Sequence, residues 1–391
     1  MRSRKNHTLS SRQVHQCALD RLVQAQLLKD HGPKCTAARV GSIVLRAAAR
    51  LISVFAAIRD LADAPCEQAV FNALQAGLPK TLSVLEKRVN LALTDQLPGR
   101  LRRRRWEIAI DFHLVPYYGK PSQSKNELYY GKPRQGTKHF HAYATACITV
   151  HGERYTLALT WVRRHESTVV VLRRLIAQIR NLNLKVRYFL LDRAFFNVPV
   201  TEYLQQEDLP FLMPVMFRGR APKKKKNRPA TGLRWIQKQK AGWYSHTLKN
   251  RKRQVTLKVC VSYRTHRNRK DGKRKQQKLL FAAWKVSGTP VQIRELYRKR
   301  FGIEASYRQL RQSRIYTCTT SPRLRLLFIA VALILRNVWV WIHDTILAVG
   351  SGVKRTIHLE RLRFKRMLDW IAQTVVTLFQ DETTPYADWK I

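Results

Sequence analysis

The spacing of apolar residues divides the chain into two regions. Up to about residue 105, apolar side chains recur every three or four positions, which is typical of amphipathic helices. Gly32-Pro33 and Ala64-Pro65 break this pattern, because proline cannot continue a helix from the preceding turn. The pattern predicts helices over residues 14–28, over 36–78 with an interruption at Ala64-Pro65, and over 85–97.

The interruption at Ala64-Pro65 leaves a short helix, a tight break and another short helix. This order is typical of helix-turn-helix proteins that bind DNA. A helical bundle whose members only pack against one another would give the same pattern, so both interpretations stay open. An arginine run at 102–105 follows. We predict a helical, helix-turn-helix-like DNA-binding domain over residues 1–105.

From residue 106 the pattern changes to short apolar runs that predict strands. These runs cover residues 106–118, 140–150, 155–162, 186–191 and 210–216. His151-Gly152-Glu153 is a hairpin signal, and amphipathic helices are predicted over 167–181, with Ser167 as N-cap, and over 199–206. Strands mixed with helices predict an α+β or α/β fold, in which helices flank a mixed sheet.

Residues 218–290 have a different character. Strand-like alternation over 243–248, 255–263 and 279–286 is separated by dense clusters of Lys and Arg, some of which we expect to be solvated loops. We interpret this segment as a basic β-rich insertion. Helices are predicted after it, over 293–311, 323–348 and 359–379. The remaining domains are therefore predicted as 106–217 joined with 291–349, the insertion 218–290, and a C-terminal helical segment 350–391.

The chain is strongly basic. Its 74 Lys and Arg against 25 Asp and Glu give a formal net charge of +49 over 391 residues. Such a charge favours a polyanionic partner, because neutralising phosphates releases counterions. A membrane surface would also attract it, but we find no basic amphipathic helix with a bulky apolar face outside the expected core segments. Nucleic acid is the favoured partner, and no membrane is expected.

Targeting and redox signals agree with a cytoplasmic, nucleoid-associated protein. No apolar run follows the basic N-terminus, so no signal peptide is expected. The most apolar stretch, Leu326–Leu335, is interrupted by Arg336 and Asn337 and is too short to span a bilayer. The six cysteines lie far apart without a Cys-x-x-Cys pair, which argues against a zinc ribbon or a disulfide framework.

Acidic residues are scarce between 101 and 310, and their positions are informative. Asp111 and Asp192 each end a predicted apolar strand, where side chains converge at the edge of a sheet. Glu304 lies on the predicted 293–311 helix. At about 100° per residue, a sector roughly 80° wide on that helix holds one acid among cations. The residues of this sector are Tyr297, Arg300, Glu304, Arg308 and Arg311.

Two interpretations of these acids are possible. A surface helix with i,i+4 ion pairs, together with ordinary exposed or capping aspartates, would need no further function. Alternatively, the carboxylates of Asp111, Asp192 and Glu304 match the oxygen ligands that a pair of Mg²⁺ ions requires. Two such ions about 4 Å apart can stabilise the attacking and leaving oxygens of a phosphodiester. The strand ends and the basic charge favour the metal site.

The motifs around these acids resemble those of insertion-sequence transposases with a DDE catalytic triad. More specifically, the motifs resemble those of the branch that has a Tyr-Arg-Glu-Lys motif and a β-strand insertion before the catalytic Glu. The matching positions are Tyr297, Arg300, Glu304 and Arg311, with Asp111-Phe-His113-Leu-Val-Pro116-Tyr117-Tyr118-Gly119 and Leu191-Asp192-Arg193-Ala-Phe195-Phe196. Arg311 stands where the family has Lys. Charge is kept there, but a planar guanidinium is not interchangeable with an ammonium.

The resemblance implies an RNase H-like catalytic domain with Asp111, Asp192 and Glu304 as metal ligands. It also implies that Tyr297, Arg300 and Arg311 contact DNA phosphates near the cut. We add as DNA-binding candidates the cations near these motifs and in the insertion: Arg193, Arg308, Lys223, Lys224, Lys225 and Lys226. Related enzymes stack a flipped base on an aromatic side chain of the insertion, for which the candidates are Trp235, Trp243 and Trp284. Core packing is the competing role for each tryptophan.

The sequence thus predicts a DNA transposase. It would bind the terminal inverted repeats of its element as double-stranded DNA, cut them with Mg²⁺ or Mn²⁺, and join them to target DNA. A homodimer in a synaptic complex is expected. The alternatives are a catalytically inactive, domesticated DNA-binding protein and an RNA-binding structural protein. The second has no reason to place acids at strand ends.

Overall fold

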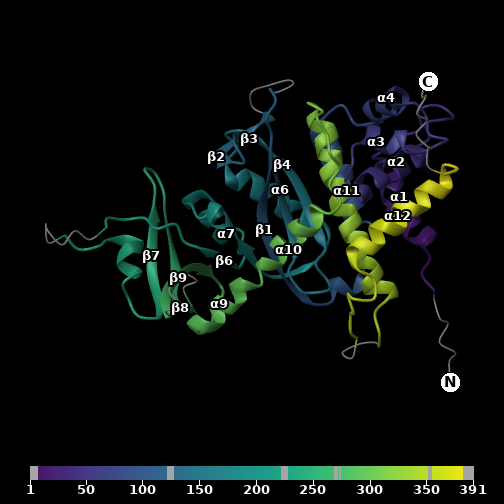
Figure 1. The fold of residues 1–391 in the computed structure, drawn as a ribbon. Coiled ribbons are helices and arrows are strands. Elements are labelled where there is room, and N and C mark those ends of the chain that lie inside the picture. The colour runs from purple at the N-terminus through teal and green to yellow at the C-terminus, as the bar shows by residue number, and fades with distance from the viewer. Residues whose placement is uncertain are drawn as a thin grey trace.

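A mixed β-sheet runs through the computed structural model, which describes residues 8–120, 127–221, 228–267, 272, 274–350 and 355–381 (Figure 1). Within these residues the sheet has nine strands, in the order β2-β3-β1-β5-β6-β9-β8-β7, and β4 also pairs with β3. The strands are β1 Arg105–Pro116, β2 Tyr129–Arg134, β3 Thr137–Ile148, β4 Thr156–Val162, β5 Lys185–Leu191, β6 Phe211–Pro214, β7 Gly242–Lys249, β8 Gln254–Arg267 and β9 Arg274–Trp284.

Strand β1 lies in the interior of this sheet. It runs parallel to β5 and antiparallel to β3, and β5 runs parallel to β6. Ile108, Ala109 and Ile110 are fully buried, because helices cover both faces of the strand and a continuous apolar run is the pattern that such a strand requires. The predicted mixed sheet with flanking helices is therefore confirmed.

The strands of the basic insertion extend the main sheet. β9 pairs with β6 in antiparallel register, from Phe211 opposite Trp284 to Pro214 opposite Phe281, and β8 and β7 follow outward. Figure 1 shows these strands as a wing at one end of the molecule. The predicted strands of the insertion exist, but they share hydrogen bonds with the sheet of the preceding segment.

Some of the helices cover the two faces of the sheet, and others pack on those helices. The helices are α1 Ser11–Gln24, α2 Ala37–Arg50, α3 Val54–Arg59, α4 Glu67–Gly77, α5 Leu82–Thr94, α6 Thr168–Asn181, α7 Val198–Gln206, α8 Gly232–Ile236, α9 Pro290–Arg298, α10 Phe301–Leu310, α11 Pro322–Trp341 and α12 Phe364–Leu378. Ile108 and Ile110 belong to a large core that includes α5, α6 and α11. Ala109 points to the opposite face, where a smaller core includes α9 and α10.

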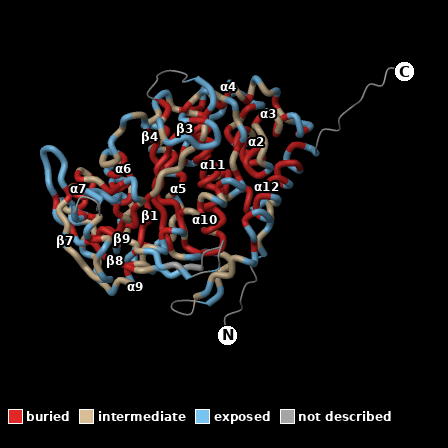
Figure 2. Tube along the Cα trace, turned by 60° about the vertical axis from the view of Figure 1, so that its left-hand side comes forward, coloured by how far each residue is buried: buried red, intermediate tan, exposed pale blue. Residues whose placement is uncertain are grey.

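The N-terminal helices share the large core instead of forming a separate one. Helix α12 packs against α1 and α2, and α5 packs against both α11 and β4 (Figure 2). The backbone N–H groups of Ala62 and Asp63 donate to carbonyls near the end of α12, at Asp381 and Phe379. The division of the chain into domains stays a prediction, but buried side chains are continuous across the predicted boundaries at 105 and 349.

Helix α11 agrees with the predicted helix over 323–348 and extends well beyond its most apolar stretch, Leu326–Leu335. It continues past Arg336 and Asn337 to Trp341 and then through a π-helical turn, Ile342–Ile346. The 25-residue segment Pro322–Ile346 is long and apolar enough to cross a bilayer, but 94% of its most apolar window is buried inside the protein. It is therefore placed as the central helix of the core, where Arg336 and Asn337 find polar partners.

The predicted helix over residues 293–311 is wrong in one respect, because it is two helices. Around Lys299 and Arg300 the backbone N–H groups bond to carbonyls three residues back, so the last turn of α9 tightens and α10 starts in a new direction. Gly302 permits the close approach of α10 to the strand β3, since a Cβ there would lie 3.0 Å from the carbonyl oxygen of Thr149. A single helical wheel therefore does not describe this stretch.

Asn337 is the polar group that joins three elements of the core. Its Nδ2 donates to the carbonyls of Leu93 at 2.9 Å and Thr156 at 2.8 Å, and its Oδ1 accepts from the N–H of Thr156 at 2.8 Å. Leucine of similar size would leave these buried groups unpaired. We expect Asn337→Leu to lower the free energy of unfolding by about 2–4 kcal/mol, measured by urea denaturation. A loss no larger than that of the exposed control Asn72→Leu would contradict this role.

Candidate active site

The alternation of side chains along β1 and β5 brings two aspartates together. Asp111 lies two residues beyond Ala109, so it points to the face that α9 and α10 cover. The parallel pairing of Ile110 with Leu191 is the last between the two strands, and Asp192 follows directly on β5. Asp111 was expected at a strand end, but β1 continues to Pro116 through its pairing with β3. The carboxylate lies instead where the parallel ladder ends.

The guanidinium of Arg300 lies at the centre of the three predicted carboxylates. Its Nη1 donates to Asp111 Oδ2 at 3.0 Å, and its Nη2 donates to Glu304 Oε1 at 2.9 Å. The same Nη2 lies 3.9 Å from Asp192 Oδ1. The structure therefore brings Asp111, Asp192 and Glu304 together around one cation, and we call these four residues the carboxylate cluster.

The carboxylate cluster is buried on one side and open on the other. The exposed side-chain fractions are 10% for Arg300 and 15% for Asp111, against 37% for Asp192 and 44% for Glu304. Burial raises the pKa of Asp111 to about 6; Arg300 opposes this shift, and the charge of Asp192 adds to it. Burial by itself would lower the pKa of Arg300, but Tyr297 and the carboxylates outweigh it and raise that pKa.

Two tyrosines fix the backbone around the cluster. The hydroxyl of Tyr307 donates to the main-chain carbonyl of Asp111 at 3.1 Å and lies 2.7 Å from the hydroxyl of Thr145. The hydroxyl of Tyr297 donates to the carbonyl of Leu191 at 3.2 Å, next to Asp192. Tyr307 was missed as a functional residue, although its position three residues after Glu304 places it on a neighbouring face of the helix.

A second acid on β1 holds the junction between α9 and α10. Glu107 is buried, and its Oε1 accepts from Lys299 Nζ at 2.8 Å and from the Tyr188 hydroxyl at 3.0 Å. Glu107 and Asp111 point to the same face of β1, so consecutive cations at the junction bind two acids of one strand. No local pattern predicts this anchor, because it depends on the break between the helices.

The other predicted cations do not touch the carboxylates. Within the described part of the chain, Arg308 and Arg311 make no ion pair with an acid. Burial lowers the pKa of His113 to about 4, with Arg311 contributing, and the His113 ring packs against Tyr307 at a centroid distance of 4.8 Å. His113 is thus a neutral packed side chain. Arg193 is exposed directly after Asp192.

The lysines and tryptophans of the insertion that were predicted to contact DNA differ in where the structure places them. Lys223, Lys224, Lys225 and Lys226 lie outside the described residues. Trp243 donates its Nε1 proton to the carbonyl of Gly288 at 2.9 Å, and Trp284 is half-buried beside the core. Trp235 is exposed and meets Tyr244 edge-on. Of the three, Trp235 leaves the most ring surface free, and its role in stacking stays a prediction.

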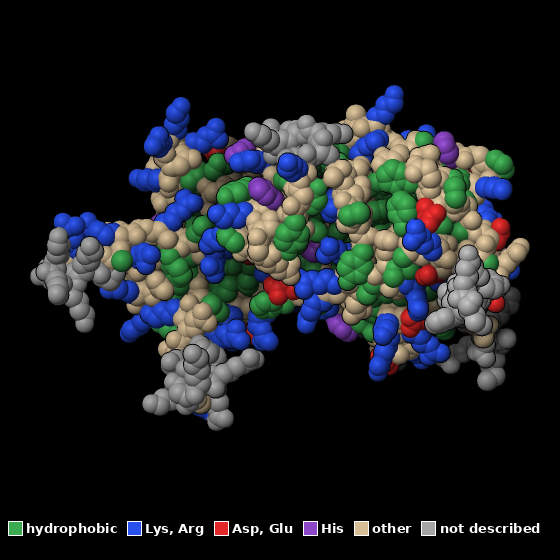
Figure 3. All heavy atoms as spheres, turned by 45° about the horizontal axis from the view of Figure 1, so that its top comes forward, with side chains coloured by type: hydrophobic (Ala, Val, Ile, Leu, Met, Phe, Trp, Pro, Cys, Tyr) green, Lys and Arg blue, Asp and Glu red, His purple; other side chains and the backbone are tan. Residues whose placement is uncertain are grey.

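A groove of about 570 Å³ is lined at one end by Arg193 and Tyr297, which are neighbours of the carboxylate cluster, and extends along the strands of the insertion. Cations and exposed aromatic rings line it together, which is the composition that suits phosphates and bases. The lining side chains that carry this character are Arg193, Phe217, Arg264, Lys278, Arg298 and Phe301. Figure 3 shows Lys and Arg spread widely over one face of the molecule, with few Asp and Glu. Phe217 and Phe301 were not among the predicted aromatic candidates.

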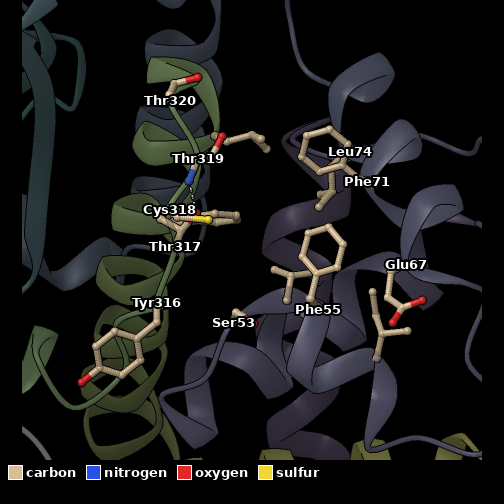
Figure 4. A pocket seen from close by; sticks show the side chains of 14 residues that line it. Ser53, Phe55, Glu67, Phe71, Leu74, Tyr316, Thr317, Cys318, Thr319 and Thr320 are labelled. Atoms are coloured by element: carbon tan, nitrogen blue, oxygen red, sulfur yellow. Dashed lines mark hydrogen bonds between the residues drawn. The ribbon is translucent and has the colours of Figure 1, made fainter. Parts of the chain in front are cut away.

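A second cavity, of about 590 Å³, lies apart from the carboxylate cluster. Figure 4 shows Phe55, Phe71 and Leu74 of the N-terminal helices facing the segment from Tyr316 to Thr320. Its one carboxylate, Glu67, is already bonded to Arg59 at 2.6 Å. The apolar lining and the paired acid make this cavity unsuited to phosphate chemistry.

The carboxylate oxygens of the cluster are donors of the type that a divalent metal prefers. Their present arrangement around Arg300 does not form a metal site. Among the described residues, no three His, Cys, Asp or Glu side chains stand close enough to hold a metal ion. However, Asp111, Asp192 and Glu304 already surround a cation, and hard divalent ions prefer oxygen donors. Arg300 stands in for the positive charge that a metal would supply.

The family comparison agrees with this geometry. Residues 102–337 match the transposase DDE domain family, and the chain belongs to that family, whose members use divalent metal ions. No curated protein sequence matches the chain. The fold is similar to that of the piggyBac transposase in a cryo-EM structure of its synaptic complex with hairpin DNA.

The similarity to the piggyBac transposase covers 97% of this chain and 75% of that chain, with a TM-score of 0.50 and 14% identity. At this identity it concerns the fold, and the mixed sheet with flanking helices is consistent with an RNase H-like transposase fold. The narrower Tyr-Arg-Glu-Lys branch stays a prediction.

Asp111 should lower the stability of the protein at neutral pH. Its folded-state pKa of about 6 lies above the ordinary 3.8, so the folded state binds more protons between these values and stability falls as pH rises through them. We expect Asp111→Asn to raise the melting temperature at pH 7.5, and the gain to vanish near pH 2.5, where Asp111 is protonated in both states. Asp208→Asn, an exposed control, should show no gain; a loss for Asp111→Asn would mean that its attraction to Arg300 dominates.

Proposed function

We propose that this protein cuts and joins DNA at the ends of an insertion sequence. The observation that carries the proposal is the meeting of Asp111, Asp192 and Glu304, from two adjacent strands and one helix, around a single cation. Membership of the DDE family and a net charge of +49 support the same reaction. The chemistry is hydrolysis of a strand at the element end, followed by attack of the exposed 3′-hydroxyl on a second strand.

The three carboxylates would hold Mg²⁺ or Mn²⁺, which activates water and stabilises charge on the phosphodiester. The chain's own residues provide the placement. Tyr307 holds the backbone of Asp111 against α10, and Tyr297 holds the end of β5 against α9. Arg300 is the nearest cation to the carboxylates, so a phosphate bound to it would lie beside them. Such placement contributes to rate because small displacements of a reacting group are costly.

The groove beside the carboxylate cluster is the proposed DNA path. Its cations Arg193, Arg264 and Arg298 neutralise phosphates, and Phe217 and Phe301 offer ring surface to bases. Double-stranded terminal repeats and target DNA are the proposed partners, bound by a homodimer in a synaptic complex. The structure of the piggyBac transposase is described as a synaptic complex with hairpin DNA.

The N-terminal helices are the proposed readers of the element ends. The short helices α3 and α4 contact each other, and α4 presents to solvent the amides of Gln68 and Asn72, which are hydrogen-bonded to each other. Amide side chains pair well with adenine edges. Because these helices share a core with α11 and α12, recognition is best tested by substitutions in the complete chain.

The metal role can be tested on each carboxylate. Asp111→Asn, Asp192→Asn and Glu304→Gln should each reduce strand cleavage at element ends at least about a thousandfold, roughly 4 kcal/mol of barrier, and leave DNA affinity within about threefold. The measurements are single-turnover nicking in Mg²⁺ and a gel-shift titration. Asp208→Asn is the matched control. Cleavage near the wild-type rate by any one variant removes that residue from the metal site, and inactivity of the wild type would favour a domesticated DNA-binding protein.

The DNA path predicts a particular salt dependence. Neutralising one phosphate contributes about 0.9 to the slope of log K against log salt. We expect Arg264→Ala to lower the magnitude of this slope by about one phosphate equivalent on random-sequence duplex. Lys365→Ala, an exposed position on α12, should leave the slope unchanged. Equal slopes for wild type and Arg264→Ala would place the DNA path elsewhere.

A further inference from the structure

Arg300 and a divalent ion would compete for the same oxygens. The guanidinium reaches Asp111 and Glu304 at hydrogen-bond distance and lies within ion-pair distance of Asp192. Arginine does not lose its proton in proteins, so the side chain cannot become neutral to admit a second cation. While Arg300 occupies this position, the three carboxylates point at it and not at a common metal position, which agrees with their spread.

The same contacts explain how the carboxylates can be assembled before a metal arrives. Three negative side chains that meet at a partly buried place repel one another, and the raised pKa of Asp111 reports the cost of burying its charge. Arg300 offsets that repulsion through one side chain. Its own backbone is held by the neighbouring bond between Lys299 and Glu107.

The groove offers Arg300 an alternative partner, a DNA phosphate. The groove begins at Tyr297 and Arg298, so a DNA backbone lying in it would pass close to the guanidinium. Phosphate oxygens match the planar donor fork of arginine and allow two parallel hydrogen bonds. The buried Nε of Arg300 makes no hydrogen bond to any described group, so a bound phosphate could satisfy a donor that the DNA-free protein leaves unsatisfied.

We infer that Arg300 is a positioning residue that holds the three carboxylates in the DNA-free protein and transfers to a DNA phosphate when DNA binds. Its departure opens the oxygens to the metal. DNA and metal then bind cooperatively, and by linkage each raises the affinity of the other by the same factor. This inference rests on the proposed function, because it takes the carboxylates as metal ligands.

The test measures Mn²⁺ binding, with no need for turnover. Metal-free full-length protein is titrated with Mn²⁺, and free Mn²⁺ is followed by electron paramagnetic resonance, with and without a short random-sequence DNA duplex. For the wild type, DNA should tighten Mn²⁺ binding at least about tenfold. Arg300→Gln should bind Mn²⁺ at least about tenfold more tightly than wild type without DNA, and DNA should then add little.

Three further variants make the outcome specific. Arg187→Gln removes an exposed cation of β5 that pairs with Glu107 and with none of the three carboxylates, and should behave as wild type. Arg300→Lys keeps the charge but cannot span the carboxylates with a planar fork, so its Mn²⁺ affinity should lie between those of wild type and Arg300→Gln. Arg300→Gln combined with Asp111→Asn should lose the gained affinity. Thermal unfolding of each variant establishes that it is folded.

The results separate this inference from the proposed function. If Asp111→Asn weakens Mn²⁺ binding but Arg300→Gln binds no more tightly than wild type, the inference fails and the metal site stands. If Arg187→Gln gained as much Mn²⁺ affinity as Arg300→Gln, the gain would come from the general loss of positive charge, and the inference would also fail. If neither wild type nor Arg300→Gln binds Mn²⁺, with or without DNA, the proposed metal site itself fails.

Discussion

The repulsion among three carboxylates, which meet where the parallel ladder of β1 and β5 ends, is the constraint on which this structure depends. Two unit charges about 4 Å apart interact by roughly 4 kcal/mol at an effective dielectric constant of about 20. A fold that brings Asp111, Asp192 and Glu304 together must therefore supply a cation. Arg300 supplies it from the junction of α9 and α10, and Lys299 secures that junction on Glu107. The break between these helices is thus a requirement of the site.

The local periodicities predicted the elements that build the site. Apolar runs located β1 and β5, and with them the acids Asp111 and Asp192. The register of β1 with β5 could not be predicted in this way, because it joins residues that are far apart in the sequence. The proximity of Asp111 to Asp192 follows from that register.

The errors have physical causes that local patterns do not contain. A helical period continues smoothly through residues 293–311, but Lys299 and Arg300 are bound to acids of β1, and these tertiary bonds accompany the bend. Asp111 was placed at a strand end because the charge was expected to terminate an apolar run. Pairing with β3 extends β1 beyond it. Phe217 and Phe301 were missed because their exposure depends on the groove around them.

The packing of α12 against α1 and α2 also bears on how such proteins can diversify. If the N-terminal helices read the element ends, as proposed above, a new specificity would require the exchange of these helices. In this chain the N-terminal helices are enclosed by a helix from the opposite end of the sequence. A functional chimaera would have to inherit both ends from one parent and only the middle from the other, so recombination at a single crossover point would break the core.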